Sequence, residues 1–218
     1  MTGIEVAGSA DLEAVMGALA LERPVFHSEA DFQHAFARTL WDVAPDVRLR
    51  LEVRQDRAAR TDPKRREYVD LLCRGGAHST AIEFKYFTRS WQGQVGDPPE
   101  EFSLRAHAAE DLARRAFVVD IERLERFCAA TGSSGIALFL TNERRLWERG
   151  GAGKKTPRDA EFRLDDSRTL AGLLRWADGK YKENDITLRG VYELRWRDYE
   201  APDQGQPRFR WLAVEIPA

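Results

Sequence analysis

Three ionisable residues lie in segments of the sequence that otherwise look like buried strands. Asp70 lies in the run 68–72, and Glu83 and Lys85 lie in the run 79–87. Asp, Glu and Lys are seldom buried without a partner, because moving a charge out of water is costly. Two carboxylates with a lysine beside them could bind a divalent cation and act on a phosphodiester. The alternative is a buried ion pair whose members only satisfy one another.

A hairpin would bring these three side chains together. Two strands, over residues 67–74 and 79–87, are expected on either side of a turn that contains two glycines. A two-residue loop in that turn places Asp70 opposite Glu83, and Lys85 lies two residues further along the same face. A slip of one residue would scatter the side chains over both faces. The chemistry therefore depends on the register.

Two helices and one strand are expected before this hairpin. The spacing of apolar residues predicts a helix over 10–22 and another that begins after Ser28, whose hydroxyl can cap it, and ends near Pro45. Residues 47–53 alternate apolar and charged side chains. Such a pattern is typical of a strand with one face in water, close to the edge of a sheet.

A crossover is expected after the hairpin. A loop runs through Pro98-Pro99, and a long helix then covers about residues 107–131 and ends at Gly132. The apolar run Gly135–Leu140 is typical of a central strand that is covered on both faces. A strand, a helix and a second strand in this order predict a parallel pairing of the two strands.

The remaining residues are expected to elaborate this core. Residues 142–165 are polar and rich in glycine, which predicts an exposed excursion, and residues 170–177 look helical. Residues 188–196 and 209–216 alternate like a terminal antiparallel pair. No linker is visible, so residues 1–218 are expected to form one domain.

The composition is that of an ordinary globular protein. The net charge of -2 carries no global signature of nucleic-acid binding, although basic residues gather at 57–66 and at 154–158. Two cysteines, Cys73 and Cys128, are too few for a disulfide framework, which favours a cytoplasmic location. No apolar stretch approaches the length of a membrane span, so no membrane contact is expected.

The order of these elements, with Asp70 and then Glu83-Phe84-Lys85 on the hairpin, resembles the PD-(D/E)XK nuclease superfamily. The resemblance covers about residues 25–141, and residues 142–218 lie beyond it. It implies a restriction-endonuclease-like fold: a three-layer α/β/α domain with a central mixed sheet, an αβββαβ core and extra C-terminal strands. One position departs from the motif, because Val69 stands where the family often has proline.

The resemblance also implies roles for single residues. Asp70 and Glu83 would bind Mg²⁺ or Mn²⁺, with the peptide carbonyl beside Glu83 as a further ligand, and Lys85 would act in catalysis. Glu29, at the start of the second helix, matches a glutamate that the family often adds. For Glu29 alone, the alternative is an acid that the helix dipole stabilises. The expected reaction is hydrolysis of a DNA phosphodiester by water that the ion activates.

Other functions remain open at this point. A catalytically inactive domain of the same fold could bind nucleic acid or protein, which the slightly acidic charge suits. The sequence does not distinguish DNA from RNA, internal from terminal cleavage, or a monomer from a homodimer. Trp91 could stack on a base or pack its loop onto the domain. Four residues are candidates to line the same cleft: Arg105, Asp111, Arg114 and Arg115.

Overall fold

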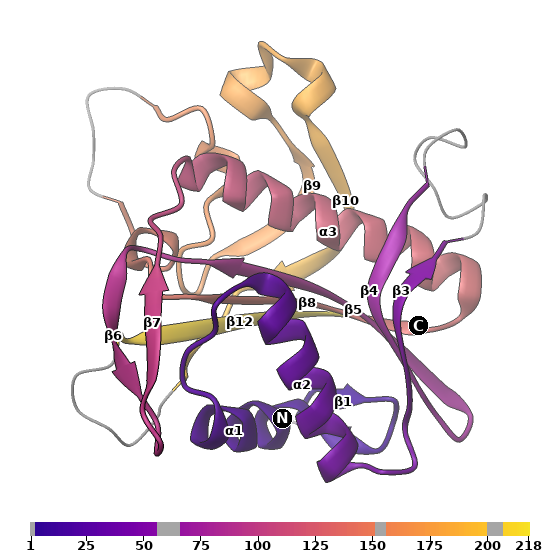
Figure 1. Cartoon of the computed structure of the whole chain (residues 1–218). Coiled ribbons are helices and arrows are strands. Elements are labelled where there is room, and N and C mark those ends of the chain that lie inside the picture. Colours follow the sequence, from indigo (N-terminus) through magenta and orange to yellow (C-terminus); the bar gives the residue numbers. More distant parts are fainter. Residues whose placement is uncertain (1–2, 56–65, 151–155, 200–206) are drawn as a thin grey trace.

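The protein, seen in a computed structural model, has a mixed central sheet with helices on both faces (Figure 1). Residues 3–55, 66–150, 156–199 and 207–218 are described. In sheet order the strands are β11 (Trp196–Tyr199), β12 (Phe209–Ile216), β8 (Ser134–Thr141), β5 (His78–Phe87), β4 (Tyr68–Gly75) and β3 (Arg48–Arg54). The α-helices of the described residues are α1 (Leu12–Glu22), α2 (Glu29–Val43) and α3 (Glu110–Thr131). The expected α/β class with a mixed sheet is confirmed.

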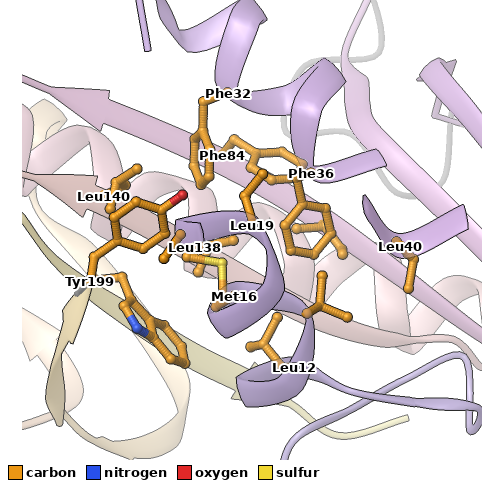
Figure 2. Packing of buried hydrophobic residues seen from close by; sticks show 14 of the residues in the cluster. Leu12, Met16, Leu19, Phe32, Phe36, Leu40, Phe84, Leu138, Leu140 and Tyr199 are labelled. Carbon is orange, nitrogen blue, oxygen red and sulfur yellow. The ribbon is translucent and has the colours of Figure 1, made fainter. Parts of the chain in front are cut away.

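The first two helices begin and end close to the predicted residues. The Ser28 hydroxyl caps α2 by accepting the Asp31 N–H at 3.2 Å. The helix buries Phe32, Phe36 and Leu40 against one face of the sheet, as the spacing of these residues requires. Figure 2 shows their side chains meeting those of α1, β5 and β8.

The register of the central hairpin is the one that a two-residue loop predicts. Gly75 stands opposite His78, and Leu72 stands opposite Ala81. β3 lies at the edge of the sheet, and β8 runs parallel to β5 after the crossover through α3. These three expectations are confirmed.

A separation of two strands creates the central feature of the fold. The pairing of β4 with β5 ends at Leu71 and Ile82, whereas β5 continues to Phe87 beside β8. β4 continues beside β3 instead, and Figure 1 shows both strands bending away from β5. The N–H groups of β5 on that side lose their partner strand at this point, so other groups must satisfy them.

The opposite face of the sheet is covered by α3. Phe117, Ile121 and Leu124 of this helix are buried against the sheet together with Phe139 of β8. Gly135 permits the close approach, because a Cβ atom there would lie 2.9 Å from the Cys128 sulfur. The helix ends at Gly132, whose φ of +69° is the left-handed conformation that glycine favours.

Residues 91–104 form a hairpin where a loop was expected. β6 (Trp91–Val95) pairs antiparallel with β7 (Glu100–Leu104). The prolines at 98 and 99 lie in the connection between the strands, where they cost no ladder hydrogen bond. Reading them as the mark of a long loop was wrong.

The C-terminal third differs most from expectation. Residues 169–174 form β9 (Thr169–Leu174), which pairs with β10 (Ile186–Glu193), so the predicted helix at 170–177 is wrong. The expected pairing of residues 188–196 with 209–216 is also largely wrong, because residues 188–193 belong to β10, which pairs with β9, whereas β12 pairs with β11 and β8. Local helix propensity is a weak preference that pairing and burial override. Only Trp196, opposite Leu212, belongs to both the expected and the observed pair.

Residues 142–165 are not a purely exposed excursion. Four of their apolar side chains are buried in the layer that covers α3: Leu146, Trp147, Phe162 and Leu164. The remaining short elements are β1 (Glu5–Val6), β2 (Ala10–Asp11), η2 (Arg144–Leu146), η3 (Ala160–Phe162), η4 (Trp176–Gly179) and η5 (Lys182–Asn184). Cys73 and Cys128 are free and buried. Within the described ranges, no helix is long and apolar enough to cross a membrane.

Candidate functional site

The four predicted site residues gather where β4 leaves β5. Asp70 comes from β4, Glu83 and Lys85 from β5, and Glu29 from the first turn of α2. The charges of Lys85 and Asp70 act on the pKa of Glu29, and the same two charges act on the pKa of Glu83. The structure therefore brings together all four residues.

Two of the carboxylates replace the missing strand. Asp70 Oδ2 accepts the Phe84 N–H at 2.8 Å, and Glu29 Oε2 accepts the Tyr86 N–H at 2.8 Å. These N–H groups belong to alternate residues of β5, so they point to the same side of the strand. Each carboxylate is held by one oxygen and retains a second one for other contacts.

The Glu83 carboxylate is buried without a comparable partner. The residue is 3% exposed, and its Oε1 accepts no hydrogen bond. Arg123 Nη2 approaches this oxygen to 3.0 Å, but the same nitrogen donates to the Tyr68 carbonyl at 2.5 Å. The contact between Arg123 and Glu83 is therefore an ion pair without the geometry of a hydrogen bond.

Lys85 is held by α3. Its Nζ lies 3.1 Å from Asp120 Oδ2, and Arg123 Nη1 lies 3.3 Å from Asp120 Oδ1. Asp120 and Arg123 are three residues apart on the helix, which places both on the side that faces β5. Together with Glu29, Asp70 and Glu83, these residues form one network of six charges.

Asp120 and Arg123 were not found from the sequence, which pointed to other residues near this helix. Asp111 instead pairs with Arg158, Arg114 pairs with Asp159, and Arg115 donates to the Asn184 carbonyl. A signal for Asp120 exists, because this acid stands between Val119 and Ile121 beside the apolar face of α3. It is the same type of signal that identified Asp70 and Glu83.

Burial dominates the ionisation of the acids. It raises the pKa of Glu29 and of Asp70 above their ordinary values, although Lys85 and the backbone N–H donors act against the shift. Burial also raises the pKa of Glu83 well above its usual range, with Arg123 opposing. For Asp120, burial raises the pKa to about 6. For all four carboxyl groups, the loss of solvation by burial therefore outweighs the stabilisation by nearby positive charges.

For the two cations, Lys85 and Arg123, the neighbouring acids outweigh the effect of burial on the pKa. Burial alone would lower the pKa of Lys85, but Asp120 and Glu29 outweigh it, so the net shift is upward. Glu83 and Asp120 likewise raise the pKa of Arg123 against its desolvation. Both side chains are therefore cationic at neutral pH.

The donor set fits a magnesium ion held by few protein ligands. Within the described ranges, no group of three or more His, Cys, Asp or Glu side chains is arranged to hold a metal. Mg²⁺ needs only one or two carboxylates, since water and substrate phosphates complete its shell. Asp70 and Glu83 would supply these carboxylates, and the Phe84 carbonyl points to the same side of β5 as its N–H. Glu83 Oε1 accepts no hydrogen bond and faces the Arg123 guanidinium at 3.0 Å, so this buried oxygen favours a positive charge beside it.

Two cavities flank the site. One of about 870 Å³ lies between the start of β4 and α3 and is lined by Tyr68, Arg115 and Arg123. The other, of about 430 Å³, is lined by Glu29, Arg105 and His107. Of the four residues that the sequence suggested, Arg115 lines the first cavity and Arg105 lines the second.

The remaining basic and aromatic candidates lie in two places. Trp91 and Arg89 line a third cavity, of about 650 Å³. Of the two basic clusters, Arg66 and Arg158 are described. The other basic residues of these clusters lie outside the described residues: Arg57, Arg60, Lys64, Arg65, Lys154 and Lys155.

No family model, curated protein or solved structure matches this chain.

Proposed function

We propose that the protein is a Mg²⁺-dependent nuclease that hydrolyses DNA phosphodiester bonds, built on a restriction-endonuclease-like fold. The order of elements supports the fold: α2, the antiparallel strands β3, β4 and β5, and then α3 leading to β8 parallel to β5. The observation that carries the function is the buried Glu83 carboxylate, whose Oε1 accepts no hydrogen bond beside Asp70.

The acids are suited to hold a cation. Asp70 and Glu83 would bind Mg²⁺ or Mn²⁺, and Glu29, held by the Tyr86 N–H, would support the ion from α2. The raised pKa values indicate that burial destabilises the charged form of each acid. A bound divalent ion would offset this cost, and it would activate water and neutralise charge on the phosphate.

Lys85 would act as a cation rather than as a base. Asp120 and Glu29 keep its pKa raised despite burial, so the ammonium group stays protonated. A protonated lysine can orient the attacking water and stabilise the charge that develops on the phosphoryl oxygens. Asp120, 3.1 Å from Lys85 Nζ, would fix its position.

A cleavage assay tests the proposal directly. Plasmid and single-stranded DNA are incubated with the purified protein and Mg²⁺ or Mn²⁺, beside Asp70→Ala and Lys85→Ala. Each variant should lose activity by about 10²–10⁴-fold, the range expected when a catalytic group is removed. The exposed Asp46→Ala and Lys180→Ala are the matched controls and should cleave like the wild type. Cleavage that persists in both site variants would exclude this site.

A second function is favoured by the closure of the charge network on itself. Lys85 is paired with Asp120, and Arg123 lies against Glu83, as expected in an inactive domain that binds nucleic acid or protein. Calorimetric titration with Mn²⁺ distinguishes the two. The nuclease should bind Mn²⁺ in a manner that Asp70→Asn abolishes, whereas the inactive domain should bind none.

A further inference from the structure

The cavity of about 430 Å³ beside Glu29 has a defined set of donors. It lies where α2 begins and is bordered by the end of β5 and by the residues that follow β7. Its volume falls at the small end of ligand pockets, which suits one nucleotide-sized group and not a duplex. Glu29 belongs both to this cavity and to the candidate metal site, so a group bound here would lie next to the reaction.

The His107 ring is fixed in one orientation. Its Nδ1 accepts the Thr88 N–H at 2.9 Å, and its backbone N–H donates to the Thr88 carbonyl at 2.8 Å. The ring also packs against Phe87, with 5.1 Å between centroids. Because a backbone amide always carries its hydrogen, Nδ1 must be the unprotonated nitrogen. The neutral ring therefore carries its proton on Nε2, which is free to donate.

Arg105 supplies an uncommitted charge. Its carbonyl accepts the Thr88 hydroxyl at 2.8 Å, which ties its backbone to β5. Among the residues that the structure describes, its guanidinium forms no ion pair or hydrogen bond, and the residue is exposed. Of the acids that line the cavity, Glu29 is bonded to the Tyr86 N–H and lies in the field of Lys85. The cavity thus offers a free guanidinium and a fixed N–H donor.

We propose that this cavity binds a backbone phosphate of the DNA strand, next to the phosphodiester that is cleaved, with Arg105 and His107 as its donors. Arg105 provides charge and paired N–H donors for the phosphate oxygens, and His107 Nε2–H adds a directed hydrogen bond. The inference rests on the proposed nuclease function. It assigns the strand contact that sets where the substrate lies relative to Glu83.

The hydroxyl side chains around the cavity agree with an anionic ligand. Ser28 Oγ accepts the Asp31 N–H, so its own hydrogen is free to donate. Ser103 also lines the cavity, and its Oγ lies 3.4 Å from Gln92 Nε2. His27 is not available, because it pairs with Glu100 at 2.9 Å and stacks on Phe102. The inference therefore assigns no role to His27.

Binding without cleavage tests the assignment. Fluorescence anisotropy is measured with a labelled single-stranded oligodeoxynucleotide in Ca²⁺, over a range of salt concentrations. Arg105→Gln should weaken binding by about tenfold and reduce the salt slope by about 0.7, the value for one lost phosphate contact on a single strand. His107→Ala should weaken binding less. The control is Arg48→Gln, which removes the same charge from the edge strand β3, opposite Arg74 of β4. It should change neither the affinity nor the salt slope.

The outcomes separate this inference from the nuclease proposal. Equal effects of Arg105→Gln and Arg48→Gln, or no binding by the wild-type protein, would overturn the phosphate site. If the wild type cleaves DNA while Arg105→Gln binds normally, the nuclease stands and the phosphate site fails. If binding depends on Arg105 but no cleavage occurs with Mg²⁺ or Mn²⁺, the strand contact stands and the nuclease fails.

Discussion

Two buried glutamates, Glu83 and Glu125, have contrasting surroundings. They are 3% and 6% exposed, respectively, and both lie between α3 and neighbouring strands. Glu125 accepts N–H bonds from Arg189 and Gly190 at 2.7–3.0 Å, and the Tyr192 hydroxyl donates to it at 2.8 Å. Oε1 of Glu83 accepts none. The Glu125 carboxylate is hydrogen-bonded through both oxygens, whereas Oε1 of Glu83 is offset only by its ion pair with Arg123.

The position of Glu125 explains why it is satisfied. The pairing of β10 with β9 is interrupted between Leu188 and Val191, which frees the N–H groups of Arg189 and Gly190. Glu125 bonds both groups and closes the gap. Asp70 and Glu29 do the same for β5, each with one oxygen. Among the described residues, Glu83 accepts no hydrogen bond from a backbone N–H, and the charge that faces it is the Arg123 guanidinium at 3.0 Å.

Activity should separate the two glutamates most widely. Glu83→Gln should reduce DNA cleavage in Mg²⁺ by about 10³-fold, since the site would lose a metal ligand. Glu125→Gln should leave the activity per folded molecule close to that of the wild type. Both are measured on the same plasmid substrate, with the folded fraction taken from circular dichroism. Equal losses of activity would mean that Glu83 is no more functional than Glu125.

Stability should reverse this order. Glu125→Gln should lower the free energy of unfolding by about 1–3 kcal/mol, because an amide nitrogen would replace the oxygen that accepts the Arg189 N–H, and the remaining bonds would lose the carboxylate charge. Glu83→Gln should change it by less than about 1 kcal/mol in the metal-free protein, since Arg123 keeps Asp120 and the Tyr68 carbonyl. Urea unfolding at pH 7 measures both. A strong loss in Glu83→Gln would identify a structural ion pair and contradict the metal site.

Arg123 should compete with the metal for Glu83. Its guanidinium lies 3.0 Å from Glu83 Oε1 and supplies the positive charge there when no metal is bound. Arg123→Gln should therefore raise the affinity for Mn²⁺ by about tenfold, as removal of a nearby like charge favours the cation. Calorimetric titration measures this, with Arg126→Gln, on the same helix, as the control. An unchanged affinity would mean that Arg123 and the metal do not share the carboxylate.

The contrast between the two glutamates was only partly visible in the sequence. The hairpin, its register and the position of Asp70 and Glu83 followed from local rules: alternation, a short turn, and charged residues within apolar runs. Asp120 and Arg123 were missed because a helix presents several faces and one sequence does not say which of them meets β5. The role of Glu125 was not predictable at all, because it depends on β10, and the arrangement of the strands beyond residue 142 was read wrongly. Contacts between segments distant in the chain determine both the role of Glu125 and the arrangement of these strands.

The pH dependence of stability should distinguish the crowded acids from a paired acid at the surface. Burial raises the pKa of Asp120 to about 6, so between its ordinary value of 3.8 and about 6 the folded protein binds more protons than the unfolded chain. The free energy of unfolding should therefore fall as the pH rises through this window, by at most about 1.4 kcal/mol per pH unit. Asp120→Asn should reduce that slope, and the other buried acids with raised pKa values should retain the rest of it.

Asp111 provides the opposite case: burial acts to raise its pKa, but Arg158 outweighs it and lowers the pKa. The pairing of Asp111 with Arg158 stabilises the fold above the unfolded pKa of Asp111, and this stabilisation is lost as the pH falls. The free energies of unfolding of wild type and Asp111→Asn should therefore converge on acidification. Urea unfolding from about pH 2 to pH 7 compares the three proteins, because the Asp111 effect falls below its ordinary pKa of 3.8 and the Asp120 effect falls above 3.8. Parallel profiles for wild type and Asp120→Asn would show that burial does not raise the pKa of Asp120 in the folded protein.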